Sequence, residues 1–168
     1  MIYVCGLHEM PMHVRVLEPG YLISLVQPEF QPPTPDEIAP GRHLRLAVDD
    51  VSQPVAGYQA PGESDVNQLI GFLRSWPGDE PLLIHCYAGV SRSTAAALIA
   101  LALNADGREL EAARRLRQAA PHAQPNSRIV ALADRLLGRG GRLVAAREAM
   151  GPASLVFEGP LVELSPLC

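Results

Sequence analysis

The stretch from His85 to Thr94 constrains the fold most, because a short apolar segment precedes it and a long one follows it. Residues 82–84 form an apolar run that follows a proline and is short enough for a buried strand. Residues 95–103 are rich in alanine and leucine, contain no helix breaker and are long enough for a helix. The stretch therefore predicts a strand, a tight loop and the first turn of a helix.

The predicted loop has the features of an anion site. A loop that opens into a helix directs several backbone N–H groups at one point, at the positive end of the helix dipole, and such a point binds anions. The same field would stabilise a thiolate at Cys86, at the mouth of the loop. The planar guanidinium of Arg92, on the first helical turn, suits two oxygens of a phosphate. A nucleophile, amide donors and a bidentate cation within residues 86–92 predict phosphoryl transfer through a cysteine.

The pattern His-Cys-x-x-Gly-x-x-Arg-Ser in residues 85–93 resembles the signature loop of the cysteine-dependent protein tyrosine and dual-specificity phosphatases. The histidine, the central glycine, the serine after the arginine and the strand-to-helix context make the resemblance specific. The small chain, with an aspartate upstream of the loop, is similar to the dual-specificity branch. The resemblance covers about residues 21–137, and it implies a phosphatase that acts on a phosphorylated protein or a small phosphomonoester.

The resemblance implies a role for each residue of the loop. Cys86 would attack phosphorus to form a cysteinyl-phosphate, and Arg92 would hold the phosphate together with the loop amides. Ser93 would bond to the sulfur and assist breakdown of the phosphoenzyme, unless it is a plain hydroxyl at a helix N-terminus. His85 would support the loop and help to stabilise the thiolate. The expected substrate-binding residues of the loop are Tyr87, Ala88, Gly89, Val90, Ser91 and Arg92.

A carboxylic acid must protonate the leaving oxygen, and the resemblance places it at the end of an upstream strand. Asp50 is the first choice because it follows the strand predicted at residues 43–48, and Asp49 is the alternative. The same aspartate would then activate the water that hydrolyses the phosphocysteine. Asp65 lies at the start of a predicted helix, where interaction with the helix dipole is a sufficient role. The Pro-Asn pair that ends at Asn126 resembles a pair found near the site in many dual-specificity members; a helix N-cap is the equal alternative.

Strand and helix patterns alternate along the rest of the chain. Runs of apolar or alternating residues predict strands at residues 2–5, 21–26, 43–48 and 82–85. Apolar residues at helical spacing predict helices at residues 64–76, 109–120, 127–137 and 142–150, besides the one after the loop. We therefore expect a single α/β phosphatase domain over residues 1–150, with a mostly parallel sheet of about four or five strands flanked by helices. Residues 151–168 are expected to be a tail that packs on the domain or is partly disordered.

Two segments before the signature loop allow alternatives. The proline-rich residues 27–41 predict a surface loop, although Thr34 could cap a short helix. Cys5, His8 and His13 could bind a metal ion. No second pair of ligands follows at metal spacing, so we expect loop histidines that face the solvent, and no metal.

The composition excludes several functions. The 168 residues, of which 48% are hydrophobic and 19% charged, suffice for one globular domain. All 14 basic side chains are arginine, which excludes lysine Schiff bases and the lysine-dependent nucleotide-binding loop. The net charge of −4 argues against nucleic acid or an anionic membrane as a partner, and the longest apolar run is too short to span a bilayer. We expect no cofactor.

Cysteine usage bears on the compartment. Cys5, Cys86 and Cys168 lie far apart and their number is odd. The first residues lack the basic region of a secretion signal, so we expect none. This pattern favours a reducing cytoplasm over a disulfide scaffold. The richness in alanine, arginine and proline suggests a bacterial genome of high GC content.

The loop also bears on the substrate. Residues 87–91 are neutral, which favours one phosphate on an apolar body such as phosphotyrosine and leaves phosphoserine and phosphothreonine open. A rhodanese-like sulfurtransferase also uses a loop cysteine, but it gives no reason for the Arg-Ser pair or the upstream aspartate. A catalytically weak phosphate-binding module would keep Cys86 and Arg92 while a displaced acid loop prevents turnover.

Overall fold

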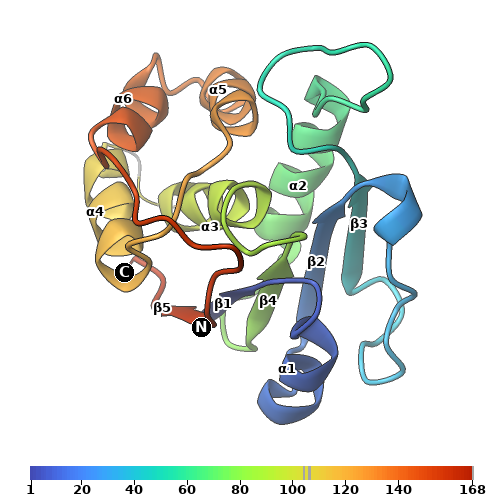
Figure 1. Cartoon of the computed structure of the whole chain (residues 1–168). Helices are drawn as coiled ribbons and strands as arrows, with labels where there is room; N and C mark the ends of the chain where they lie inside the picture. Colours follow the sequence, from blue (N-terminus) through green and yellow to red (C-terminus); the bar gives the residue numbers. More distant parts are fainter. Residues whose placement is uncertain (104, 106, 168) are drawn as a thin grey trace.

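Four parallel strands and one antiparallel strand form the central sheet (Figure 1). The computed structural model describes residues 1–103, 105 and 107–167, so Cys168 of the predicted tail lies outside the described residues. In sheet order the strands are β3 (His43–Ala47), β2 (Tyr21–Val26), β4 (Leu82–His85), β1 (Ile2–Cys5) and β5 (Val162–Leu164). Only β5 is antiparallel to its neighbour. The predicted α/β fold with a mostly parallel sheet is confirmed.

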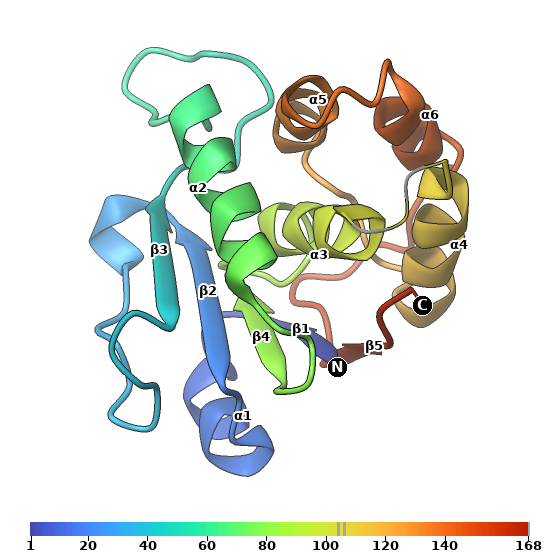
Figure 2. The same ribbon diagram turned by 180° about the vertical axis from the view of Figure 1, so that it is seen from behind.

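Helices cover both faces of the sheet. They are α1 (Met10–Leu17), α2 (Glu63–Ser75), α3 (Arg92–Leu103), α4 (Glu109–Ala119), α5 (Ser127–Leu136) and α6 (Arg142–Glu148). Side chains alternate across each strand. Ile23 and Ile84 therefore pack into the larger core with α2–α6, while Leu22 and Leu83 pack with α1 on the other face. Figures 1 and 2 show α1 apart from the other five helices, at the opposite side of the sheet.

Helix α3 lies at the centre of the larger core. Every residue of α3 is buried except Ala100, which is half-buried. A helix that is buried all round needs no polar face, which explains the unbroken apolar run of residues 95–103. The helix follows β4 through the signature loop, so the predicted strand, loop and helix are observed in that order.

Helix α1 was not predicted. The sequence indicated a loop with exposed histidines around Pro11, but Pro11 lies in the first turn of the helix, where a missing N–H costs no hydrogen bond. Met10 and Val14, one turn apart, are buried against the sheet. The expectation that His13 faces the solvent from a loop is therefore wrong, because His13 is buried on α1. Among the described residues, no group of three or more His, Cys, Asp or Glu side chains could hold a metal ion.

The remaining elements agree with the sequence to within one or two residues at their ends. The proline-rich residues 27–41 form a loop with one 3-10 turn, Pro28–Phe30. Part of the predicted tail enters the sheet as β5, beside β1. In the described part of the chain, no helix is long and apolar enough to cross a membrane.

Candidate active site

The signature loop connects β4 to α3 at the carboxyl edge of the parallel strands. Cys86 is almost fully buried at the start of this loop, with 2% of its surface exposed. Its Sγ lies 3.1 Å from Oγ of Ser93, in the first turn of α3. Ser93 is therefore close enough to hydrogen-bond the sulfur.

Backbone contacts from outside the loop orient its peptide groups. The carbonyl of Tyr87 accepts a hydrogen bond from Leu7 N–H at 3.0 Å, and that of Ala88 accepts one from Gly159 N–H at 2.8 Å. The carbonyl of Val90 accepts from Gln124 N–H at 2.9 Å. In a trans peptide the N–H points away from the carbonyl. Carbonyls that face the surrounding chain therefore turn the next N–H groups toward the other side of the loop, where an anion would bind.

Gly89 allows the loop to lie directly on the end of β1. Its φ is +70°, and a Cβ built on it would lie 2.8 Å from the carbonyl carbon of Cys5. A residue with a side chain would meet both the left-handed backbone and this contact. Gly89 thus supports the loop from behind and does not line the pocket in front of it.

Arg92 is buried beneath the loop, with 3% of its surface exposed. Its Nη1 donates to the carbonyl of Val48 at 2.7 Å and to Oε1 of Gln27 at 3.1 Å. Its Nε is buried and has no protein partner among the described residues. Arg92 is therefore anchored through Nη1, while its Nε keeps a donor that no described protein group accepts.

Asp50 and Asn126 meet at the mouth of the loop. Oδ1 of Asp50 accepts hydrogen bonds from Ser91 Oγ at 2.6 Å and from Asn126 Nδ2 at 2.9 Å. Oδ1 of Asn126 in turn accepts from the N–H groups of Arg128 and Ile129, each at 3.1 Å, at the start of α5. Asn126 thus caps a helix and also donates to Asp50, while its role in binding substrate stays a prediction.

The other aspartates have different partners. Asp49 accepts a hydrogen bond from the N–H of Gln59 at 2.6 Å and closes the base of the loop between β3 and α2. Asp65 accepts from the N–H of Gly62 at 2.8 Å, at the start of α2. The assignment of Asp50 as the acid stays a prediction, but of these three aspartates only Asp50 lines the pocket with Cys86.

A chain of hydrogen bonds runs from His85 to the protein surface. Oγ of Ser24 lies 2.6 Å from Nε2 of His85 and 2.7 Å from Nε2 of His43. Nδ1 of His43 lies 2.9 Å from Oγ1 of Thr34, and Nδ1 of His85 lies 3.4 Å from the carbonyl of Cys86. In the sequence, the one sign of these hydrogen bonds is Ser24, a serine in an otherwise apolar strand.

Burial keeps both imidazoles of this chain neutral at neutral pH. Burial lowers the pKa of His85 to about 4, against the hydrogen bond to the Cys86 carbonyl and with a contribution from nearby His43 and Arg92. Burial, together with the charge of Arg45, lowers the pKa of His43 to about 4. A neutral imidazole donates from one nitrogen only. If Nδ1 of His85 donates to the Cys86 carbonyl, then Nε2 of His85 accepts from Ser24. Ser24 in turn accepts from His43, and His43 accepts from Thr34. Every donor then points toward Cys86.

The pocket in front of Cys86 has a volume of about 560 Å³. The predicted residues Tyr87, Ala88, Val90, Ser91, Arg92, Asp50 and Asn126 line it. The sequence did not predict its other polar residues, Gln27, Ser52, Gln124, Ser127 and Arg147. Beside it, the ring of Tyr87 packs edge-on against Phe30, with ring centres 5.2 Å apart. Cys86 therefore opens onto a pocket with polar walls and an aromatic edge.

Known proteins resemble parts of this sequence and its fold. A family model of PTP-like phytases, described as inositol hexakisphosphate, matches residues 45–103. A search of curated protein sequences found no significant match. Among solved structures, DUSP15 is similar at 18% identity, with a TM-score of 0.59 and 89% of each chain covered.

Two further solved structures share the fold. PTPMT1 in complex with PI(5)P is 15% identical, with a TM-score of 0.62, and the match covers 86% of this chain and 93% of that one. The Yvh1 phosphatase domain from Chaetomium thermophilum is 16% identical, also with a TM-score of 0.62, and the match covers 84% and 93%. The chain thus has the fold of the dual-specificity phosphatases, and the family model of PTP-like phytases matches the part of it that contains the loop from Cys86 to Arg92.

Proposed function

We propose that this protein is a phosphatase that hydrolyses phosphomonoesters, with protein phosphotyrosine as its substrate, through a cysteinyl-phosphate intermediate. The observation that carries the proposal is the arrangement around Cys86. Its sulfur lies 3.1 Å from Ser93 Oγ, and it shares one pocket with Asp50 and with Arg92, which keeps a buried Nε without a protein partner.

In the first step the thiolate of Cys86 attacks phosphorus, and the bond from phosphorus to the ester oxygen breaks. The loop amides and Arg92 hold the three non-bridging oxygens, over which the charge spreads in the transition state. Protonated Asp50 gives its proton to the leaving oxygen. The products are the free alcohol, the cysteinyl-phosphate and the carboxylate of Asp50.

In the second step water attacks the phosphorus of the cysteinyl-phosphate. The carboxylate of Asp50 takes a proton from this water, and the bond from phosphorus to sulfur breaks. The sulfur leaves as a thiolate, which the hydroxyl of Ser93 can stabilise by donating a hydrogen bond. Inorganic phosphate is released, and Cys86 and Asp50 return to their starting states. No metal is required, so a chelator should not inhibit the reaction.

Two features support phosphotyrosine as the substrate. The side chains of the loop, Tyr87 to Ser91, are neutral, and the exposed rings of Tyr87 and Phe30 form an aromatic edge beside the pocket. Such an edge can pack against the phenyl ring of the substrate. The mechanism also needs a reduced thiol, which is consistent with a cytoplasmic location.

The test is hydrolysis of p-nitrophenyl phosphate and of phosphotyrosine, phosphoserine and phosphothreonine peptides by the wild type and by Cys86→Ser. We expect hydrolysis of the aryl phosphate and the phosphotyrosine peptide by the wild type, and none by the variant. A wild type that binds phosphate but turns over no substrate would favour a phosphate-binding module. Transfer of sulfur from thiosulfate, without phosphatase activity, would favour a sulfurtransferase.

A further inference from the structure

A second arginine lies in the wall of the catalytic pocket. In the described part of the chain, the charged side chains that line this pocket are Asp50, Arg92 and Arg147. Arg92 is buried beneath the signature loop, whereas Arg147 comes from α6 and is half-buried. The proposed reaction uses Asp50 and Arg92 and gives Arg147 no role.

In the described part of the chain, Arg147 forms its hydrogen bond through Nε. Nε donates to the carbonyl of Pro125 at 2.8 Å. Nη1 and Nη2 have no protein partner among the described residues, and no described carboxylate forms an ion pair with this guanidinium. An arginine at a pocket wall with two free donor groups suits a carboxylate or a phosphate, which can accept both.

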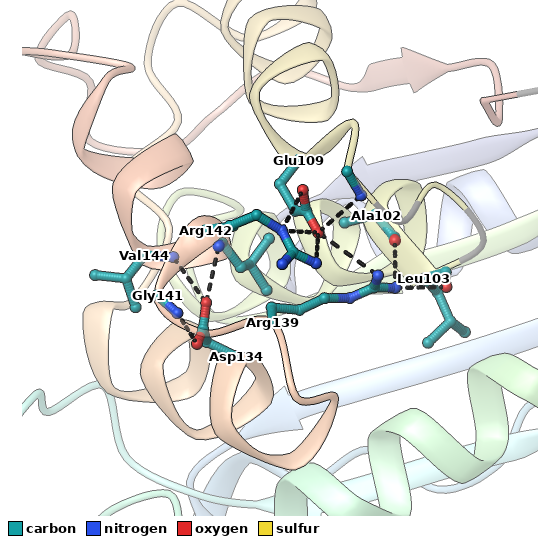
Figure 3. A network of polar contacts seen from close by, with 10 residues as sticks. Ala102, Leu103, Glu109, Asp134, Arg139, Gly141, Arg142 and Val144 are labelled. Atoms are coloured by element: carbon teal, nitrogen blue, oxygen red, sulfur yellow. Dashed lines mark hydrogen bonds and ion pairs between the residues drawn. The ribbon is translucent and has the colours of Figure 1, made fainter.

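The helix that carries Arg147 is fixed by buried charges (Figure 3). Asp134, on α5, accepts hydrogen bonds from the N–H groups of Gly141 at 2.7 Å and Leu143 at 2.8 Å, at the start of α6. Glu109, almost fully buried on α4, forms ion pairs with Arg139 at 3.6 Å and Arg142 at 3.4 Å. These contacts fix α6 to α4 and α5, so the place of Arg147 at the pocket does not depend on a mobile segment.

A second hollow adjoins the catalytic pocket. Ser52 and Ser127 line both the catalytic pocket and a neighbouring hollow of about 340 Å³, which Arg128 also lines. A single phosphorylated side chain does not need this second hollow. A peptide does, because the chain continues on both sides of the phosphorylated residue. The adjoining hollow therefore favours an extended peptide over a compact phosphorylated polyol.

We propose that Arg147 binds a second anionic group of the substrate, the carboxylate of an acidic residue close to phosphotyrosine in a peptide. This inference rests on the proposed phosphatase function and names its substrate class. Arg92 takes the phosphate that is hydrolysed, and Arg147 selects the sequence around it. The net charge of the whole chain is −4, so attraction for an acidic peptide comes from arginines at this pocket and not from the overall charge.

The test compares two phosphotyrosine peptides that differ only in their flanking residues, glutamate in one and glutamine in the other. We expect the wild type to prefer the glutamate peptide roughly tenfold in kcat/KM, as one charge-assisted contact allows. In Arg147→Gln this preference should disappear, and in Arg147→Lys it should be partly kept. Arg114→Gln is the matched control, because it removes the same charge from an exposed position at a separate hollow, and it should keep the preference.

The outcomes separate this inference from the proposed function. Equal rates of the wild type on both peptides would overturn the role of Arg147 and leave the phosphatase intact. Failure of the wild type on both peptides and on p-nitrophenyl phosphate would overturn the proposed function itself. A faster reaction with an inositol bisphosphate than with either peptide, lost in Arg147→Gln, would overturn the peptide as the source of the second anion. Because the wild-type comparison needs no variant, the test stands even if Arg147→Gln does not fold.

Discussion

Oγ of Ser24 lies 2.6 Å from Nε2 of His85, on the neighbouring strand β4. Because Oγ of Ser24 also lies 2.7 Å from Nε2 of His43, the hydroxyl connects the histidine before Cys86 to a second histidine nearer the surface. With both imidazoles neutral, all donors of this hydrogen-bonded chain can point in one direction, toward the carbonyl of Cys86. Aligned hydrogen bonds polarise one another, so the chain should favour negative charge at the sulfur.

Replacing Ser24 by alanine should slow the reaction of Cys86 with iodoacetamide. The variant interrupts the chain between His85 and His43, and loss of one such hydrogen bond corresponds to roughly a fivefold slower reaction in mildly acidic buffer. Ser75→Ala is the matched control, because Ser75 bonds only to the carbonyl of Phe72 at the end of α2. Equal alkylation rates for the wild type and Ser24→Ala would show that the chain does not act on the thiolate.

Two histidines of the hydrogen-bond chain, buried His85 and half-buried His43, should make folding sensitive to acid. The pKa of His85 and of His43 is lowered from 6.5 to about 4 in the folded protein, mainly by burial. Between these values the unfolded chain binds protons that the folded chain does not. The free energy of unfolding should therefore be at its full value above about pH 6.5 and fall as the pH decreases toward about 4, with His85 alone contributing about 3 kcal/mol to the fall.

Urea titrations at neutral pH and at about pH 4.5 measure this loss of unfolding free energy. We expect a smaller loss in His43→Gln than in the wild type, because one of the two groups no longer takes up a proton on unfolding. An equal loss in the two proteins would contradict the effect of His43.

Asp50 and Asp49 should differ in their effect on poor leaving groups. Asp50→Asn removes the proposed acid and should lower kcat for an alkyl or phenyl phosphate by about 100-fold, with a smaller effect for the good leaving group p-nitrophenol. Asp49→Asn changes only the contact with Gln59 and should not change the dependence on the leaving group. Steady-state rates over a series of substituted phenyl phosphates distinguish the two. The reverse result would place the acid at Asp49.

A side chain at Gly89 should distort the loop. Gly89→Ala meets the left-handed backbone and the Cys5 backbone at 2.8 Å, and it should reduce the free energy of unfolding by at least about 2 kcal/mol. Gly71→Ala is the control, because Gly71 lies within α2 and a Cβ there meets nothing within 4 Å; it should stabilise the protein by about 0.5–1 kcal/mol. Urea midpoints of the two variants that move in the same direction would contradict this account.

The sequence predicted the features that depend on local order. The strand, loop and helix around Cys86 follow from consecutive residues. The position of Asp50 at the pocket follows from its place after a strand. The pairing of Cys86 with Ser93 is local as well, because both lie at the ends of one loop. Such features need no knowledge of how distant segments pack.

Features that depend on packing could not be predicted. Ser24, His43 and His85 lie on three different strands. The sequence of one strand does not indicate which residues of the other strands it contacts. Arg147 is one of 14 arginines, and only the fixed position of α6 brings it to the pocket. Helix α1 was missed for a different reason. Pro11 resembles a breaker in the sequence but is harmless in a first turn.

The central claim is that phosphate passes through Cys86. Rapid acid quench of the enzyme during turnover of a phosphotyrosine peptide, followed by mass spectrometry of its peptides, tests this most directly. We expect one phosphoryl group on the peptide that contains Cys86 and no such adduct in Cys86→Ser. A phosphoryl group on another residue, or turnover that continues in Cys86→Ser, would contradict the mechanism.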